Sequence, residues 1–390
     1  MSVLAGIAAA ALSAAAITVG TATTAIAADD ATSAEDVGAV FVQTNDRAEN
    51  SVVAFSRAAN GTLTRVGEFG TGGKGSFEQN VPLDALASQD SLTYDREHQL
   101  LFAVNAGSDT VTSFAVDGTR LVRQQIVPSG GQFPVSVTAQ HGLVFVLNAG
   151  GAGNVTGYRL DGTGRLHAIP HSSRDLGLHN DARPDFISAP ADIAITPDDQ
   201  HVVVTTKNNG SVDVFGVNNG RLSAPVKNPS AGAVPFAVAF DAQHHLVVAN
   251  ASSTVSTYEV RDDGTLRTIT AALPDNQAAL CWITGAGNRF FGANAGSDTI
   301  SEFVIDADGN ASLAGSPDGV VAHTSGGPID LDITDDGSQL FVQNALAGTV
   351  EAYRVTAGGQ LNLVDVEEGL PQFDVAGGGA ASGMEGLVAI

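Results

Sequence analysis

One strand–turn–strand unit recurs along this sequence. Residues 101–114 read LFAVNAGSDTVTSF, and residues 290–303 read FFGANAGSDTISEF. Each copy has an apolar run, a turn of Asn, Gly, Ser and Asp, and a second run that ends in an aromatic residue. This pattern predicts two antiparallel strands joined by a hairpin, because Asn, Asp and Gly tolerate the positive φ of tight turns. A repeated unit of this kind constrains the fold more than any other feature of a sequence.

The Asn that ends the first strand of this unit occurs seven times, at Asn45, Asn105, Asn148, Asn208, Asn250, Asn294 and Asn344. A strand ending in Phe or Tyr follows each of them, and in most units a third strand begins after a Gly-x-Leu turn. A fourth strand with the pattern Pro-x-x-apolar precedes the Asn in several units, as at Pro190 and Pro328. Seven units of four strands predict an all-β fold, a seven-bladed β-propeller.

The first unit has no fourth strand before it, because residues 29–36 are small and acidic and form a short linker. A matching segment occurs at the other end of the chain, where residues 384–389 read MEGLVA. We therefore predict that the C-terminal strand completes the N-terminal blade within a propeller of residues 37–390. Closure of the ring removes the exposed strand edges at which sheets aggregate.

Residues 1–28 resemble a secretory signal peptide. They are small and apolar and end with the A-x-A pattern of Ala25, Ile26 and Ala27, which is typical of a cleavage site. The positive residues that usually begin such a segment are missing, since Arg47 is the first basic residue, and an N-terminal membrane anchor is the alternative. We predict a secreted, extracellular protein with no membrane attachment after cleavage.

Composition narrows the range of partners. The 42 acidic and 18 basic residues give a net charge of −24, which argues against nucleic acid as a partner because its binding needs a basic surface.

Cys281 is the single cysteine, so we expect a buried apolar side chain and no intrachain disulfide. The motifs of zinc sites, P-loops and nucleophile elbows are absent from the sequence, and we expect a monomer without metal or cofactor.

Two long connections, residues 68–89 and 171–189, are predicted to lie on one face of the ring around the central opening. Loops on a rigid scaffold are where binding and catalysis usually occur. In the second connection His179, Arg183 and Asp185 form a possible anion-binding and proton-transfer set, although solvated loop residues are the simpler interpretation. Residues 318–327 form a further connection, in which His323 is a candidate ligand-binding residue.

The repeat provides an internal alignment in which unusual residues stand out. At the position after the Pro, five units have apolar residues, whereas two neighbouring blades have Asp90 and Glu385. Two close carboxyl groups can share acid and base roles, although both could equally hydrogen-bond to loop backbone. Before the strand-end Asn, Lys207 is the only charged residue among the seven. It could stabilise an oxyanion, or it could pair with Asp192 or with a loop carboxylate.

Gln89 and Gln277 replace the Pro in two units, and Trp282 follows on an inner strand. We predict that these three residues contact a ligand, as do Asp185 and His323. For Trp282, packing between blades is the alternative.

Units of the form L-F-V-x-N-x-x-x-x-T-V-x-x-Y followed by D-G-x-L, together with the closing strand, resemble the lactonase family of seven-bladed propellers over Val37 to Ile390. That family includes bacterial 6-phosphogluconolactonase and fungal carboxymuconate cyclase. The resemblance implies opening or closing of a lactone ring near the central channel, by polar residues such as His, Arg and Glu and without metal. The Pro-His-x-His segment of the phosphogluconolactonase branch is not matched, since the nearest segment, from Pro170, reads PHSS.

The resemblance therefore assigns no catalytic residue by position. The first hypothesis is an exported lactonase-like hydrolase or cyclase that acts on a small anionic or cyclic ester, with Lys207, Asp90 and Glu385 at the channel and His179 and Arg183 in support. The second is a non-catalytic extracellular propeller that binds a ligand or protein on its loop face, because one fold serves many functions.

Overall fold

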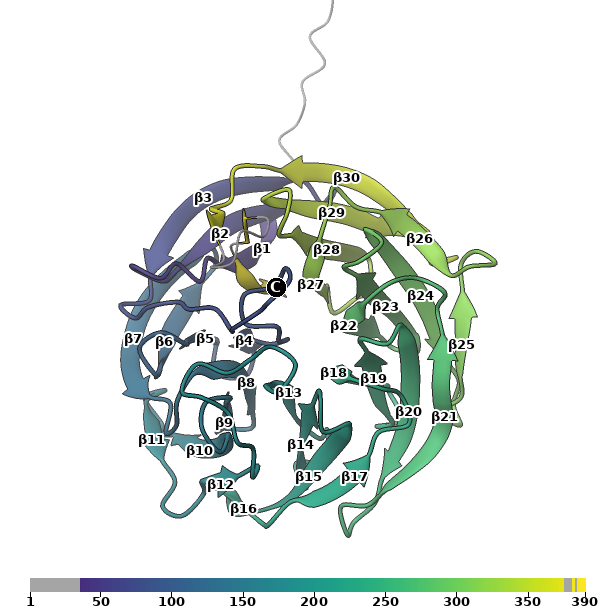
Figure 1. Cartoon of the computed structure of the whole chain (residues 1–390). Coiled ribbons are helices and arrows are strands. Elements are labelled where there is room, and N and C mark those ends of the chain that lie inside the picture. Colours follow the sequence, from purple (N-terminus) through teal and green to yellow (C-terminus); the bar gives the residue numbers. More distant parts are fainter. Residues whose placement is uncertain (1–35, 375–380, 383) are drawn as a thin grey trace, which may run out of the picture. The chain divides into compact units, whose positions relative to one another are not determined.

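The computed structural model describes residues 36–374, 381–382 and 384–390. These residues form seven antiparallel sheets arranged as blades around a central axis (Figure 1), which confirms the predicted all-β propeller. The predicted signal peptide, residues 1–28, and the linker up to residue 35 lie outside the described residues. Within the described ranges there is no helix with the length and hydropathy needed to span a membrane.

Four blades have one continuous strand at each of the four positions. From the axis outward they are, for blade 1, β33 (Glu385–Ala389), β1 (Asp36–Gln43), β2 (Ser51–Ala58) and β3 (Leu63–Gly70); for blade 2, β4 (Leu92–Asp95), β5 (Leu100–Asn105), β6 (Thr110–Asp117) and β7 (Arg120–Pro128); for blade 5, β18 (Pro235–Phe240), β19 (Leu246–Asn250), β20 (Thr254–Val260) and β21 (Leu266–Pro274); and for blade 7, β27 (Pro328–Ile333), β28 (Gln339–Asn344), β29 (Thr349–Val355) and β30 (Leu361–Glu367).

In the other three blades the outermost strand is broken into two short pieces. These blades are, for blade 3, β8 (Pro134–Gln140), β9 (Leu143–Asn148), β10 (Asn154–Leu160), β11 (Leu166–Ala168) and β12 (Arg174–Asp175); for blade 4, β13 (Pro190–Ile195), β14 (His201–Thr206), β15 (Ser211–Asn218), β16 (Arg221–Leu222) and β17 (Val226–Pro229); and for blade 6, β22 (Leu280–Ala286), β23 (Arg289–Asn294), β24 (Thr299–Ile305), β25 (Ala311–Ala314) and β26 (Val320–His323). A short hairpin of β31 (Phe373–Asp374) and β32 (Ala381–Ser382) precedes β33.

Burial follows the position of a strand in its blade. All six residues of β5 are buried, because the middle strands lie between the faces of two neighbouring blades, whereas most residues of the outermost strand β7 are exposed. At the end of β5, Asn105 donates from Nδ2 to the hydroxyls of Thr110 (3.1 Å) and Thr112 (3.0 Å) on the next strand. At Asn105, therefore, the repeated Asn is a turn device, as predicted from its repetition.

Residues 318–327, predicted as a connection, contain a strand instead. The residues Val320–His323 form β26, which pairs with β24 at the outer edge of blade 6. Gly315 and Gly319 make the break between β25 and β26 possible, with φ values of 83° and 75° that favour glycine. The His323 side chain is exposed on this outer edge, and it is not among the residues that line the cavities described below.

The C-terminal strand closes the ring as predicted. β33 pairs with β1 in antiparallel register, with Val42 opposite Leu387. On its other side, two carboxylates of β27 accept hydrogen bonds from the β33 backbone, Asp330 from Leu387 N at 2.6 Å and Asp332 from Ala389 N at 2.8 Å. The closing strand is therefore attached to both of its neighbours.

Deletion of residues 384–390 tests this closure. The truncation removes the ladder with β1 and the buried side chains of Met384 and Leu387, so we expect the melting temperature to fall by about 10 °C or more. Thermal unfolding followed by circular dichroism measures the change, with Leu363→Ser, a substitution at an exposed position, as the control. Equal melting of the truncated and full-length chains would contradict the closure.

Candidate functional site

Residues 84–91, here called the plug segment, cross the mouth of the central channel and bind to several blades. Its backbone carbonyls accept hydrogen bonds from side chains of blades 4 and 6, Ala87 O from Lys207 Nζ (2.8 Å) and Ser88 O from Trp282 Nε1 (2.8 Å). The amide of Gln89 bridges the inner strands of blades 5 and 6, with Nε2 donating to Val238 O (3.3 Å) and Oε1 accepting from Ile283 N (3.0 Å). The plug segment is thus fixed at the ring axis.

The plug segment adopts a strained backbone that its own side chains help to hold. Ala87 and Asp90 have φ values of 44° and 58°, which L residues rarely adopt. The carboxylate of Asp84 accepts hydrogen bonds from the backbone N of Leu86 (3.2 Å) and of Ser88 (3.0 Å), as Asp does in tight turns. Strained segments of this kind are often found at functional sites.

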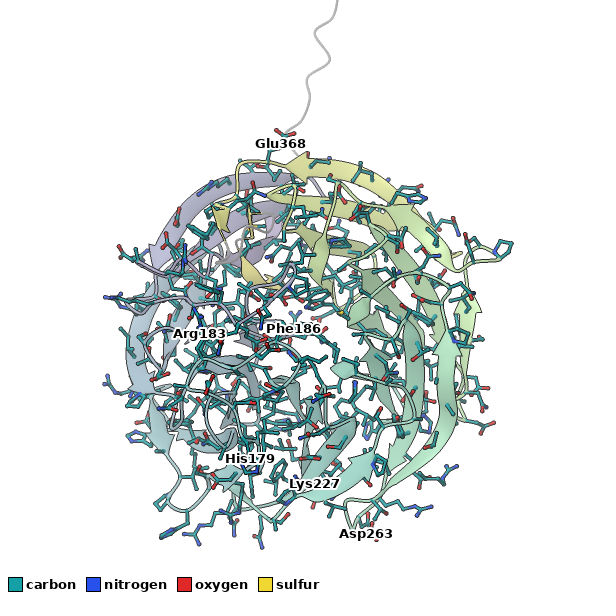
Figure 2. All side chains as sticks on the ribbon, in the orientation of Figure 1. His179, Arg183, Phe186, Lys227, Asp263 and Glu368 are labelled. Carbon is teal, nitrogen blue, oxygen red and sulfur yellow. The ribbon has the colours of Figure 1, made fainter. Side chains whose placement is uncertain are left out.

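The two long connections pack against each other, which supports their predicted position on one face. Gln79 lies beside Asp185 as a parallel bridge, and Phe186 N donates to Gln79 O at 3.0 Å. The guanidinium of Arg183 lies 4.6 Å from the centre of the Phe77 ring. Figure 2 shows Phe186 over the centre of the ring, whereas His179 lies farther out.

A cavity of about 320 Å³ lies between the plug segment, the second long connection and blades 4, 5 and 6; we call it the loop-face cavity. The residues that line it are Val81, Pro82, Leu83, Asp84, Ala87, Phe186, Ile187, Lys207, Val234, Phe236, Ala251, Ala279, Cys281, Trp282 and Ala295. Among these lining residues only Lys207 and Asp84 carry charge. The cavity is therefore an apolar space with two charged groups in its wall, which is the usual composition of a small-molecule site.

Lys207 extends from the end of β14 into this wall and is 2% exposed. Its Nζ donates to Ala87 O, lies 3.5 Å from Oε2 of Glu78, and is 5.4 Å from the centre of the Phe236 ring. The loop carboxylate that the sequence offered as a partner for Lys207 is thus Glu78 and not Asp192. A buried lysine needs such partners, because burial of an unpaired charge is very costly.

Glu78 is a member of this site that the sequence did not single out. Its side chain is fully buried, and neither carboxylate oxygen accepts a normal hydrogen bond from the described residues, the contact with Lys207 being long. Burial raises the pKa of Glu78 well above its usual value, and the Lys207 charge opposes this increase. The only signal in the sequence was its place in an insertion, in the run from Phe77 to Asn80.

Glu385, at the start of β33, pairs with Asp84 of the plug segment. Oε1 of Glu385 accepts a hydrogen bond from Leu86 N at 2.7 Å, and the two carboxyl groups hydrogen-bond to each other, which requires one of them to hold a proton. Burial raises the pKa of both groups, and the Asp84 charge raises the pKa of Glu385 further. One proton is therefore shared between Glu385 and Asp84.

Asp90 lies in a separate part of the channel. It lines a cavity of about 470 Å³ together with Asp330, Asp332 and Arg96, and Glu385 is not among the lining residues. Burial raises the pKa of Asp90 well above its usual value, and the charges of Asp192, Asp330 and Asp332 add to the effect. The structure thus brings Glu385 together with Asp84 instead of Asp90, and the catalytic role of Asp90 stays a prediction.

The remaining predicted residues divide into those near the plug segment and those away from it. Gln89 and Trp282 bind the plug segment in place, and Trp282 also lines the loop-face cavity. Asp185 accepts a hydrogen bond from Asn80 Nδ2 (2.5 Å) and helps to join the two long connections. Gln277 accepts a hydrogen bond from the hydroxyl of Thr299 within blade 6 and does not line either cavity.

The cavity wall contains strain and an unreactive thiol. Val234 and Ala279 have φ values of 56° and 59°. This conformation is unusual for any L residue and is especially unfavourable for Val234, because its side chain is β-branched. Burial raises the pKa of the Cys281 thiol to about 12, so it remains protonated at neutral pH and is a poor nucleophile. No group of three or more His, Cys, Asp or Glu within residues 36–374, 381–382 and 384–390 is placed to hold a metal ion.

Comparison with known proteins confirms the family resemblance. Residues 154–283, from β10 to the inner strand of blade 6, match the family described as lactonase, 7-bladed beta-propeller. No curated protein sequence matches this chain.

Solved structures with the same fold include two candidate 6-phosphogluconolactonases. The one from Bacteroides fragilis has a TM-score of 0.68 and 16% identity, covering 90% of this chain and 97% of its own. The one from Bacteroides uniformis has a TM-score of 0.68 and 17% identity, covering 91% and 100%. A periplasmic gluconolactonase from Pseudomonas aeruginosa has a TM-score of 0.61 and 19% identity, covering 89% and 98%. At these identities the likeness establishes the fold.

The ion pair of Lys207 and Glu78 predicts a pH-dependent effect of Lys207→Met. The folded pKa of Glu78 lies above that of the unfolded chain, so its contribution to stability is present at low pH and is lost as the pH rises through the folded pKa. Removal of the Lys207 charge raises the folded pKa of Glu78 further, so the loss of stability continues to higher pH values. We therefore expect Lys207→Met to lower the free energy of unfolding more at pH 8 than at pH 5.

Urea unfolding at the two pH values measures this difference, with Lys227→Met as the matched control at a lysine that contacts Leu176 O instead of a carboxylate. The double variant Lys207→Met, Glu78→Gln should lose most of the added pH dependence. An equal effect of Lys207→Met at both pH values would show that the ion pair does not control the ionisation of Glu78.

Proposed function

We propose that this lactonase-like propeller opens or forms the ring of a small lactone in the loop-face cavity. The observation that carries the proposal is the position of Lys207, a buried cation in the wall of a largely apolar cavity, close to carboxyl groups with raised pKa values. Groups with perturbed pKa values that meet in a cavity are typical of active sites.

Lys207 is suited to stabilise negative charge on the lactone carbonyl oxygen. An ammonium group has three N–H donors, of which one is directed to Ala87 O and one faces the long contact with Glu78. A remaining donor can serve an oxyanion within the cavity. In a site from which water is largely excluded, such a donor stabilises the transition state more strongly than it would in water.

Asp84 is suited to act as the general base, because it lines the cavity and its ionised form is supported by backbone N–H donors. A water oxygen bonds to the carbonyl carbon while Asp84 accepts one of its protons. The carbonyl electron pair moves to the oxygen beside Lys207 and then returns as the ring C–O bond breaks. Asp84 gives its proton to the leaving ring oxygen, so one water is consumed and a hydroxy acid is formed. Ring formation is the reverse of these steps.

Glu385 supports this role of Asp84. Burial raises the pKa of Asp84, and the hydrogen bond with Glu385 opposes this increase and so supports the Asp84 carboxylate that acts as the base. The protonated Cys281 thiol is excluded as a competing nucleophile at neutral pH. The described side chains therefore favour attack by water over a covalent intermediate.

Steady-state hydrolysis of a panel of lactones tests the proposal. We expect turnover by the wild-type chain and a loss of kcat/KM of about 100- to 1,000-fold for Lys207→Met, the range observed when one oxyanion donor is removed. Asp84→Asn should lose about 100-fold or more, as expected for a general base. Lys227→Met and Asp263→Asn, at two exposed positions that do not line the cavity, serve as controls of the same residue types and should retain activity.

Two results would count against the proposal. If no lactone in the panel is hydrolysed, the enzymatic function is rejected, and a lactone that still binds would support the alternative of a non-catalytic binding propeller. If hydrolysis occurs but Lys207→Met retains wild-type activity, the reaction takes place elsewhere on the molecule.

We also propose that the protein is exported, on the basis of the A-x-A pattern at Ala25, Ile26 and Ala27. The expected product is a secreted chain that begins at or next to Ala28. Expression with the native N-terminus, followed by mass spectrometry of the N-terminal peptide in the medium, measures this. Retention of residues 1–28 on the cell-associated protein would favour the membrane-anchor alternative.

A further inference from the structure

We infer that the substrate of the loop-face cavity is an alkyl-substituted lactone, a cyclic ester with an apolar tail, and not a polyhydroxylated or phosphorylated sugar lactone. The inference rests on the proposed function and assigns its substrate class. It depends on three properties of the cavity: the polarity of its wall, the supply of positive charge, and its size.

The wall of the cavity offers few partners for hydroxyl groups. Phe186, Phe236 and Trp282 form much of it, and aliphatic residues form most of the remainder. The one polar atom of the Trp282 ring already donates to Ser88 O. A sugar lactone would bury several hydroxyl groups without partners, and each unsatisfied group carries a large penalty. An alkyl tail carries no such penalty and gains from burial.

The charge of the site is unsuited to a phosphate. Lys207 is the only cation among the lining residues of the cavity, and it already faces Glu78. Asp84 and Glu385 add two further carboxyl groups nearby. Proteins recognise phosphate through several cationic or backbone N–H donors, often with an arginine in bidentate contact. A phosphorylated lactone would meet one shared lysine and repulsion from the Asp84 carboxylate.

The size and shape of the cavity fit a ring with a short tail. Its volume of about 320 Å³ is at the lower end of the range for small-molecule sites. The charged groups lie in its buried part, while Leu83, Phe186 and Ile187 at its edge are partly exposed. A carbonyl group placed at Lys207 would therefore direct the substituent of the ring toward these apolar edge residues.

A homologous series of lactones tests this orientation. The probes are an unsubstituted six-membered lactone, the same ring with alkyl tails of increasing length, gluconolactone and 6-phosphogluconolactone. We expect kcat/KM to rise by about fourfold for each added methylene until the cavity is full, as expected for burial of one methylene. The two sugar lactones should react at least about 100-fold less efficiently than the best alkyl lactone.

A variant that narrows the cavity tests whether the tail occupies it. Ala251→Leu adds apolar volume to the wall, so it should reduce kcat/KM for the longest tail far more than for the unsubstituted ring. The matched control is Ala357→Leu, at an exposed position that does not line this cavity, and it should leave the whole series unchanged. Equal effects of Ala251→Leu across the series would overturn the placement of the tail.

Binding can be measured without turnover, because Trp282 is the single tryptophan of the chain and lines the cavity. We expect alkyl lactones to change its fluorescence in a saturable manner, and gluconolactone and 6-phosphogluconolactone to have no effect at the same concentrations. Preferred hydrolysis of a sugar lactone would overturn the substrate class and leave the proposed function intact. Alkyl-lactone binding with no hydrolysis of any lactone would reject the proposed function and support the assigned ligand class. Failure of alkyl lactones to bind would overturn the inference.

Discussion

Closure of the ring by β33 is the constraint on which the rest of the structure depends. The strand pairs with β1 along one edge, and Asp330 and Asp332 accept its backbone N–H groups along the other. The same strand begins with Glu385, whose carboxyl group meets Asp84 and Leu86 of the plug segment. Closure therefore does more than remove a free edge, because it also places one of the site's acids. A change in the position of β33 would alter the plug segment and the cavity together.

The site contains buried charge that a stable fold does not need. Lys207, Glu78 and Asp84 are nearly or fully inaccessible to solvent, and burial raises the pKa values of Glu78 and Asp84. Apolar residues of similar size would often stabilise a protein as well or better than such a group of charges. The positive φ of Ala87 and Val234 adds strain at the same place. The buried charge and the strain are concentrated at one mouth of the ring, which is where we propose that the reaction takes place.

The sequence predicted the scaffold well because the scaffold repeats. A residue that recurs at the same position of seven units, such as the strand-end Asn105, is recognised as structural by this repetition. At the position before that Asn, Lys207 is the only charged residue among the seven units. Glu78 and Asp84 have no counterparts in other blades, because they belong to an insertion, so the internal alignment held no information about them. Glu385 was identified, but its partner depends on the path of the plug segment across the axis, which no local pattern specifies.

His323 lies on a strand instead of in the predicted connection, because the outer strand of blade 6 continues after a break. Its segment lacks a clear turn-to-strand signal, and the two glycines at 315 and 319 break the outer strand without ending the blade. Outer strands tolerate such breaks because they contact fewer neighbours than inner strands do. The inner strands tolerate fewer breaks, since each one faces the channel and two adjoining blades. A rigid inner ring combined with variable insertions allows the chemistry at the channel mouth to change while the fold is preserved. For this reason, the likeness of this chain to gluconolactonase structures indicates its architecture, whereas the substrate that we propose depends on the plug segment and the wall around Lys207.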